Sequence, residues 1–399
     1  MAACSVRRVL SQTLSRFRCS GRHVTLRDSP GSAVTSQAVR DKCSACWVNV
    51  SQHESIGRHF LKGGGGGRGG GGGGGGGVLW VAVAFSFFST DEDQRDEAQR
   101  KEDEMILLLK KAKLSVSRGQ LQAASGLLHQ AVVVAHQIQN HQAVIYTYSL
   151  MANLAYVQGQ LDHAEKLFKA AMGFMLSGGT PEDDNAVIEM SLKLATIYAE
   201  QNKTELAEHG FRFCTESLEA KLQKHKETAA EDRTEEQEAL RKETRLLLGL
   251  CFDSRARYRA STLHLKQAVQ DYQSALDICS QEQGDTHPQT LVLMSDLATV
   301  LDLQGRHDDA LALVQRAVDL SRSAGHPDQH VLLGNMAGIL LHTGRLEDSV
   351  RFYQEALGLA RQAGDQEAVD QIQEGLQEVK KRRRNQEKER KEDEEAAKQ

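Results

Sequence analysis

The sequence predicts an all-α protein, a solenoid of about six helical hairpins that follows a disordered N-terminal leader. Three observations carry this prediction. A spacing of small and bulky residues recurs along the chain, which is the signature of a repeat architecture. The chain has only four prolines in 399 residues, so few positions interrupt a helix. Ala, Leu, Gln and Glu, which favour helices, are abundant between residues 104 and 379.

The recurring unit is a small residue followed at the fourth position by a bulky one and at the seventh by another small one. Antiparallel helices approach closely only where their facing side chains are small, and a bulky residue one turn later fills the space beside the contact. The clearest units, each written with the turn residue before it, are Gly159/Ala164/Phe168/Ala171, Gly305/Ala310/Val314/Ala317 and Gly344/Ser349/Tyr353/Ala356. Fainter units are Gly119/Ala124/Leu128/Ala131, Asn202/Ala207/Phe211/Cys214 and Leu263/Ala268/Tyr272/Ala275.

Each unit marks the second helix of a predicted hairpin, and the first helix lies before the turn. In the second hairpin the first helix carries one apolar stripe, made of Tyr148, Met151, Ala152 and Ala155, and Gly159 permits the turn. The fifth and sixth hairpins repeat this arrangement. We therefore expect the repeats to pack through Gly159, Ala164, Phe168, Ala171, Gly305, Ala310, Ala317, Gly344, Tyr353 and Ala356.

Residues 1–62 predict a mitochondrial presequence. Arginines alternate with Val, Leu, Ser and Phe while acids are scarce, which is typical of amphipathic transit peptides. A secretory signal would need an apolar run near the start, and none is present. The arginines are Arg7, Arg8, Arg16, Arg18, Arg22 and Arg27. The alternative interpretation is a plain disordered basic tail.

Three short segments connect this leader to the helices. Residues 63–77 are glycine except for Arg68, and no Gly-Lys-Ser/Thr follows, so we interpret them as a flexible linker. Residues 78–90 begin with an apolar stretch that ends at Phe88 and is shorter than the ~20 residues that span a bilayer. We interpret this stretch as an inner-membrane sorting or anchor segment; the alternative is that it packs against the first hairpin. Residues 91–103 form an acidic linker.

The helical body departs from the repeat spacing in its middle and at its end. The interval from Ala207 to Ala268 is 61 residues, whereas the other intervals are 39–43 residues. It contains a mostly charged stretch, Lys221 to Arg245, which predicts a helix extension or a loose excursion. Arg255 occupies a position where leucine is expected, so the geometry of the fourth hairpin is left open. Residues 380–399 predict a charged, solvated tail rather than a nuclear localisation signal.

Residues 104–379 resemble the tetratricopeptide repeat family, whose short form has a period of about 34 residues. Each unit here therefore has longer helices or connections. Gly284 to Thr290 and Gly325 to Pro327 resemble the longer repeats of kinesin light chains, while the consensus Trp is absent throughout. The resemblance implies a helical solenoid that binds other proteins and has no enzymatic activity.

The resemblance also implies that side chains of the first helices, away from the packing stripe, line a concave surface that holds a peptide. Tyrosine rings contribute contact area and Asn amides bind backbone, which suits an extended or helical peptide. A clamp for an acidic chaperone tail would need several Lys and Arg, and only Lys193 fits. The partner-groove candidates are Tyr146, Ser149, Asn153, Tyr156, Lys193, Thr196, Ser295, Thr299 and Asn335. The alternative for each of them is simple exposure.

Side chains suited to catalysis or metal binding are not grouped in the sequence. Cys43 and Cys46 have metal or redox spacing, but a second pair is missing. His307 and the two acids after it begin a helix, where acids favour the positive helix end. Gly-x-Ser-x-Gly, His-Glu-x-x-His and Walker patterns do not occur. We therefore expect no catalytic residue, no metal and no cofactor, and neither a nucleic acid nor a small-molecule substrate.

Three strings resemble one mitochondrial branch of the family more closely than they resemble the general repeat; these are Glu104–Ser115, Tyr146–Ala155 and His287–Thr299. This resemblance implies a factor of respiratory complex III at the mitochondrial inner membrane, attached through residues 78–88. It implies the Rieske iron–sulfur subunit and the core subunits as partners. The implied role is to support assembly and integrity of the complex by helping to clear N-terminal fragments of the Rieske subunit. The alternative is a cytosolic cargo or cytoskeletal adaptor of the kinesin light-chain kind.

Overall fold

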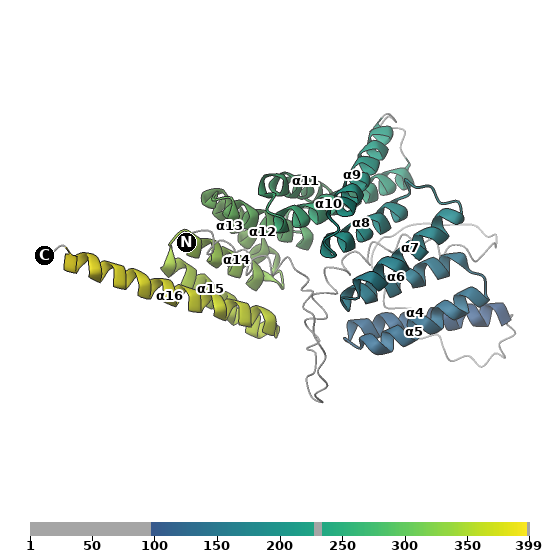
Figure 1. Ribbon diagram of the computed structural model, residues 1–399, viewed down its shortest axis with the longest axis horizontal. Helices are drawn as coiled ribbons and strands as arrows, with labels where there is room; N and C mark the ends of the chain where they lie inside the picture. Colours follow the sequence, from purple (N-terminus) through teal and green to yellow (C-terminus); the bar gives the residue numbers. More distant parts are fainter. Residues whose placement is uncertain (1–96, 227–233, 397–399) are drawn as a thin grey trace, which may run out of the picture. The chain divides into compact units, whose positions relative to one another are not determined.

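The computed structural model describes residues 97–226 and 234–396, and every regular element within these ranges is an α-helix (Figure 1). The prediction of an all-α protein is therefore confirmed. The predicted presequence, glycine linker and apolar segment lie outside the described residues. The described helices divide into two compact units. We call them the N-terminal unit, residues 97–179, and the C-terminal unit, residues 180–226 and 234–396.

The N-terminal unit consists of two helical hairpins. Its helices are α4 (Glu97–Ser117), α5 (Leu121–Gln137), α6 (His141–Val157) and α7 (Leu161–Ser177). Helix α4 packs against α5, and α6 packs against α7. Helix α5 also packs against α6, so the second hairpin stacks on the first.

The C-terminal unit contains four more hairpins and a final helix. Its helices are α8 (Asn185–Glu200), α9 (Thr204–Lys226), α10 (Glu235–Ser261), α11 (Leu265–Gln283), α12 (Pro288–Leu303), α13 (His307–Ala324), α14 (Gln329–His342), α15 (Leu346–Ala363) and α16 (Gln366–Ala396). Successive helices pack against each other throughout the unit. Within the described ranges, the two units thus hold the six hairpins that the repeat spacing predicts.

The turn inside each hairpin places one residue in the left-handed region of backbone conformation. Gly159, Gly305 and Gly344 do so with φ of 74°, 79° and 77°. Glycine adopts such angles without steric cost because it has no Cβ. Asn202 and Leu263 occupy the same place in the third and fourth hairpins, with φ of 59° and 66°. Asparagine tolerates this conformation, but a bulky leucine in it is strained.

The small and bulky residues of the repeat lie in the helix contacts. Their side chains are at most 6 % exposed at Ala164, Phe168, Ala171, Ala310, Ala317, Tyr353 and Ala356. Gly210 shows how closely two helices approach: a Cβ added there would lie 2.8 Å from Cβ of Ala195. Helices α8 and α9 therefore touch almost backbone to backbone at this point, as the small-residue positions require.

The long interval between the third and fourth hairpins is largely a helix extension. Helix α9 continues to Lys226 and α10 already begins at Glu235, with residues 227–233 outside the description. Thr234 and Gln237 form a reciprocal capping box at the start of α10. Lys221 in the extension donates to Oδ1 of Asn185 at 2.9 Å, which ties α9 to the start of α8.

Arg255 does not disturb the fourth hairpin, because its charge is paired inside the helix contact. Its guanidinium donates two hydrogen bonds to Asp271, at 3.0 and 2.7 Å, and one to Oγ1 of Thr215 at 3.1 Å. Arg259 donates to the same carboxylate at 2.7 Å. Asp271 lies on α11 and Thr215 on α9, so the network joins three successive helices.

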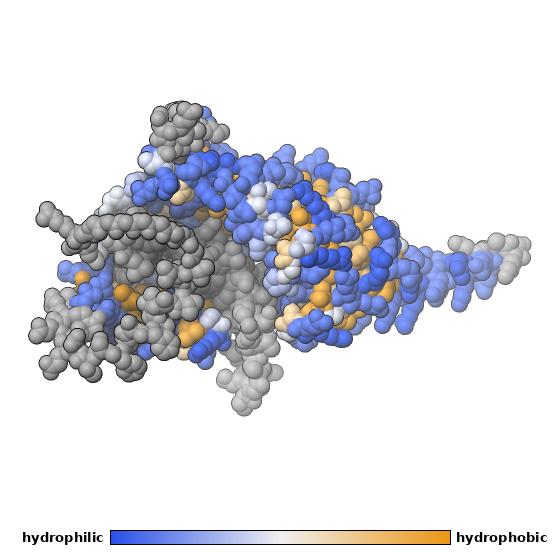
Figure 2. Space-filling model, turned by 180° about the vertical axis from the view of Figure 1, so that it is seen from behind, coloured by the Kyte–Doolittle hydropathy of each residue, from blue (hydrophilic) through white to orange (hydrophobic). Residues whose placement is uncertain are grey.

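Helix α16 continues through the predicted boundary between residues 379 and 380. Val379 is fully buried, and Arg382 donates to the backbone carbonyl of Leu341, near the end of α14, which also accepts from the backbone N–H of Gly344 at 3.3 Å. Arg383 pairs with Glu347. Beyond these contacts the helix projects from the unit with a hydrophilic surface (Figure 2). Part of the basic run thus fastens α16 to α14 and α15.

Candidate peptide-binding groove

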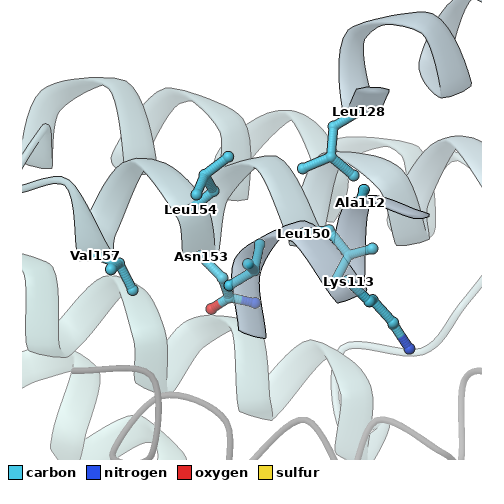
Figure 3. Close-up of a pocket in the computed structure, with 8 residues that line it drawn as sticks. Ala112, Lys113, Leu128, Leu150, Asn153, Leu154 and Val157 are labelled. Atoms are coloured by element: carbon cyan, nitrogen blue, oxygen red, sulfur yellow. The ribbon is translucent and has the colours of Figure 1, made fainter. Parts of the chain in front are cut away.

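The N-terminal unit contains a small pocket between α4 and α6 (Figure 3). Its walls are almost wholly apolar. Lys113 and Asn153 supply the only polar side chains of this lining. The remaining lining residues are Ala112, Val116, Leu128, Leu150, Leu154 and Val157.

Asn153 lies in this pocket with its hydrogen-bonding capacity unused. The residue is 3 % exposed, and neither Nδ2 nor Oδ1 has a hydrogen-bond partner among the described residues. A buried polar group without a partner costs roughly 1–3 kcal/mol. An amide presents one donor group and one acceptor, which match the carbonyl and N–H of a peptide backbone. The pocket therefore has the chemistry of a site for an extended chain with an apolar side chain.

Tyr146 lies on the same face of α6 as Asn153, two turns nearer the start of the helix. The ammonium of Lys113 sits 5.2 Å from the centre of its ring, a cation–π contact between α4 and α6. Tyr156, like Tyr146, is half-buried and offers part of its ring to a ligand. Ser149 differs, because it is 2 % exposed and its hydroxyl donates to the carbonyl of Ile145 at 2.9 Å. Of the four candidates on α6, Ser149 is thus the least available.

The candidates of the C-terminal unit are mostly satisfied within their own helices. The hydroxyl of Thr196 donates to the carbonyl of Leu192 at 3.0 Å, and that of Thr299 donates to the carbonyl of Ser295 at 2.9 Å. Asn335 donates to the hydroxyl of Ser295 at 2.7 Å, which links α14 to α12. Lys193 is half-buried on α8. Most of the polar groups at these positions already form hydrogen bonds within the protein, so fewer of them are available to a ligand.

A charged cluster on α10 and α12 was not foreseen from the sequence. Arg257 donates two hydrogen bonds to Asp253, both at 3.0 Å, and lies 3.6 Å from Asp296. The two carboxylates, Asp253 first and then Asp296, raise the pKa of Arg257 well above its ordinary value. Because its charge is already paired, Arg257 does not create a free site for a carboxylate. Only the i to i+4 spacing of Asp253 and Arg257 could have revealed the pair.

Two histidines near the turn of the fifth hairpin, His307 and His342, hydrogen-bond with one carboxylate. Asp302 is almost fully buried and accepts one hydrogen bond from each of two rings. The Nδ1 atom of His307 lies 2.7 Å from one carboxylate oxygen, and that of His342 lies 2.5 Å from the other. Within the described residues, no group of three or more potential ligands is arranged for a metal ion.

The chain is similar to one protein family and to several named proteins. The tetratricopeptide repeat family matches residues 265–323. Tetratricopeptide repeat protein 19, mitochondrial, of Danio rerio is 70% identical over 277 residues, which are 69% of this chain and 68% of that protein. The proteins of the same name in Mus musculus and Homo sapiens are 53% and 50% identical over 217 residues. Those residues are 54% of this chain and 58% and 56% of the two mammalian proteins, little more than half their length.

Proposed function

We propose, since this chain belongs to the tetratricopeptide repeat protein 19 family, that it is a non-enzymatic mitochondrial scaffold that binds respiratory complex III. In this role it supports assembly and integrity of the complex by helping to clear N-terminal fragments of the Rieske subunit. The mitochondrial location is supported by the relatives, which are named as mitochondrial proteins. The link to complex III is supported by the resemblance of the three sequence strings around α4, α6 and α12.

The observation that carries the binding function is the unpaired Asn153 amide in the apolar pocket. Both amide atoms are shielded from water in this conformation, so a peptide reaches them only when the pocket opens; the two hydrogen bonds that it then supplies remove an existing cost. Tyr146 and Tyr156 add ring surface at the rim. The pocket is small, about 10 Å³, and its lining is apolar. In the proposal a hydrophobic residue of the peptide packs at its mouth, so recognition depends on the peptide backbone and that residue, and the peptide's charges contribute little.

Co-migration tests the assignment to complex III. Full-length protein is added to detergent-solubilised mitochondria, and the complex is separated on a native gel. We expect the protein to move with complex III together with the Rieske and core subunits. The Asn153→Leu variant, which keeps the size of the side chain but loses the amide, is expected to co-migrate less. Migration of the wild-type protein apart from the complex would contradict the assignment.

Attachment to the inner membrane is a second part of the proposal. None of the helices in the described ranges is long and apolar enough to cross a bilayer. Residues 78–88 lie outside the description, and in the proposal they hold the protein at the membrane surface. Carbonate extraction of mitochondria measures this directly. Retention in the pellet is expected, whereas full release into the supernatant would remove the anchor.

The leader decides between this function and the cytosolic adaptor of the kinesin light-chain kind. Residues 1–88 fused to a fluorescent reporter are expected to direct it into mitochondria, because the arginine-rich, acid-poor segment is typical of a presequence. A reporter that stays in the cytosol would favour the adaptor. Replacing the six leader arginines with glutamine gives the matched control, which should abolish import.

A further inference from the structure

The first two hairpins contain a long stretch without any acid. None of the 54 Asp and Glu residues of the chain lies between Met105 and Leu161, a range that covers most of α4 and all of α5 and α6. The same range contains four cations, Lys110, Lys111, Lys113 and Arg118. All four lie on α4 or directly after it. Three acids of the same helix, Glu102 to Glu104, come directly before this range, so the positive charge belongs to the second half of α4.

The outer face of α4 combines those cations with exposed leucines. Leu107 and Leu114 are seven residues apart, which places them on one helical face, and they are 50 % and 48 % exposed. Lys110, Lys111 and Arg118 are exposed beside them. The opposite face of the helix carries the buried residues Met105, Leu109, Ala112 and Val116. We call Leu107, Lys110, Lys111, Leu114 and Arg118 the α4 outer face.

This face is separate from the pocket that holds Asn153, and no other described helix of the unit covers it. Lys113, the remaining cation, points to the groove, where it lies over Tyr146. Helix α4 is the first described helix, so no preceding hairpin of the described chain packs on its outer side (Figure 1). Terminal repeats of a solenoid normally need a polar outer face for solubility. Two half-exposed leucines at this position depart from that requirement.

We propose that the α4 outer face docks on an anionic phospholipid bilayer surface. Leu107 and Leu114 reach the boundary between headgroups and acyl chains, while Lys110, Lys111 and Arg118 lie among the phosphates. The lack of acids in the second half of α4 favours this occupant, because a carboxylate beside these cations would be repelled by the phosphates. Asp103 and Glu104 lie one turn before Leu107 and mark the N-terminal end of the face. Eight residues separate Phe88 from α4 and extend to about 28 Å at most. This short connection keeps α4 near any bilayer that holds residues 78–88. The docking therefore rests on the membrane attachment proposed above.

Vesicle flotation tests the docking with the full-length chain. The six leader arginines are first replaced with glutamine in every sample, so that the leader contributes less and contributes equally to all samples. Vesicles contain phosphatidylcholine alone or phosphatidylcholine with phosphatidylglycerol. The triple variant Lys110→Gln/Lys111→Gln/Arg118→Gln is expected to bind the anionic vesicles roughly tenfold or more weakly. The variant Leu107→Ser/Leu114→Ser is also expected to bind them more weakly.

A matched control removes three exposed cations from α16. Lys380→Gln/Lys381→Gln/Arg384→Gln changes the net charge equally and should alter binding less than twofold. All substituted side chains on α4 are exposed, so the helical circular dichroism should be unchanged. Unchanged binding of the α4 triple variant, or an equal loss in the α16 control, would overturn the proposal. Substitution of the apolar residues in 78–88 lowers binding to both vesicle types, which separates failure of the anchor from failure of the α4 face.

Discussion

Leu263 is held in a backbone conformation that leucine avoids. Its φ is 66° at the turn between α10 and α11, and its side chain is 55 % exposed, so little packing offsets the strain. Glycine occupies the equivalent place in four other hairpins, where φ is also positive. The left-handed conformation costs a residue with Cβ roughly 1–2 kcal/mol. The fourth hairpin keeps this strain because the contacts of the neighbouring helices fix the turn.

Replacement of Leu263 by glycine should therefore stabilise the protein. We expect the unfolding free energy in urea to rise by about 1 kcal/mol, since strain relief exceeds the greater flexibility of glycine in the unfolded chain. Leu263→Ala is the matched control, because it removes the exposed leucine but keeps Cβ. It should gain much less. An equal gain in both variants would assign the effect to the exposed side chain and not to the backbone.

Cys279 makes stability depend on pH in the alkaline range. Burial raises the pKa of its thiol to about 12, and the nearby Asp253 carboxylate adds to the shift. The unfolded chain loses this proton near the ordinary pKa of 9.0, whereas the folded chain keeps it. Stability from this group is thus complete below pH 9 and is lost at about 1.4 kcal/mol per pH unit as the pH rises toward 12.

The Cys279→Ala variant isolates this contribution. Between pH 8 and pH 10, the unfolding free energy of the wild-type protein should fall by about 1 kcal/mol more than that of the variant. The comparison is needed because burial also raises the pKa of Cys251 and Tyr272. Both proteins share those groups, so their effect cancels. Parallel pH profiles for the two proteins would show that the thiol is not protected in the folded state.

At the scale of helices, the buried ion pair between Arg255 and Asp271 joins the two helices of the fourth hairpin. The Asp271 side chain is 5 % exposed and accepts from both Arg255 and Arg259. Removing one partner of a buried pair leaves the other charge uncompensated. Arg255→Leu should thus lower the unfolding free energy by roughly 1–3 kcal/mol, although leucine matches the repeat pattern better.

The double variant Arg255→Leu/Asp271→Leu should recover at least half of that loss, because both buried charges are then gone. Arg316→Leu serves as the control. Its pair with Asp285 is exposed on both sides, and such pairs contribute about 0–1 kcal/mol. Urea unfolding of the four proteins measures all three differences. A neutral or stabilising Arg255→Leu would show that the network does not hold the hairpin.

The sequence predicts the helices well because their signals are local. Small residues at Ala164 and Ala171, and glycine at Gly159, reveal one hairpin within a short window, and the same window recurs along the chain. Arg255 was uninterpretable from its neighbours, since its partners lie 16 residues later, at Asp271, and 40 residues earlier, at Thr215. A pattern of helix periodicity does not contain contacts of that range.

The candidate groove shows the same limit. Its residues follow from the resemblance to the repeat family, but their availability does not. Ser149 and Thr299 look like Asn153 in the sequence, being polar residues on first helices. In the structure both hydroxyls donate to their own helix, as Ser and Thr commonly do, whereas the Asn153 amide finds no partner among the described residues. Only the three-dimensional surroundings distinguish a used polar group from an unused one.

At the scale of the whole molecule, the repeats provide two surfaces with different chemistry in the N-terminal unit. We propose the pocket between α4 and α6 as the peptide site and the outer face of α4 as the membrane site. A scaffold with this arrangement would hold a protein fragment beside a bilayer without forming or breaking a covalent bond. The C-terminal unit contributes further hairpins, whose first helices carry mostly paired polar groups.

Titration of an N-terminal Rieske peptide into the full-length protein, followed by calorimetry, tests the role of the groove most directly. The Asn153→Leu variant should bind the peptide roughly tenfold more weakly, because two hydrogen bonds are lost. It should also be more stable than the wild-type protein, since an unpaired buried amide is removed. Thr196→Val, whose hydroxyl already donates to Leu192, should keep its affinity within twofold. Equal affinity of Asn153→Leu and the wild-type protein would contradict peptide binding through this pocket.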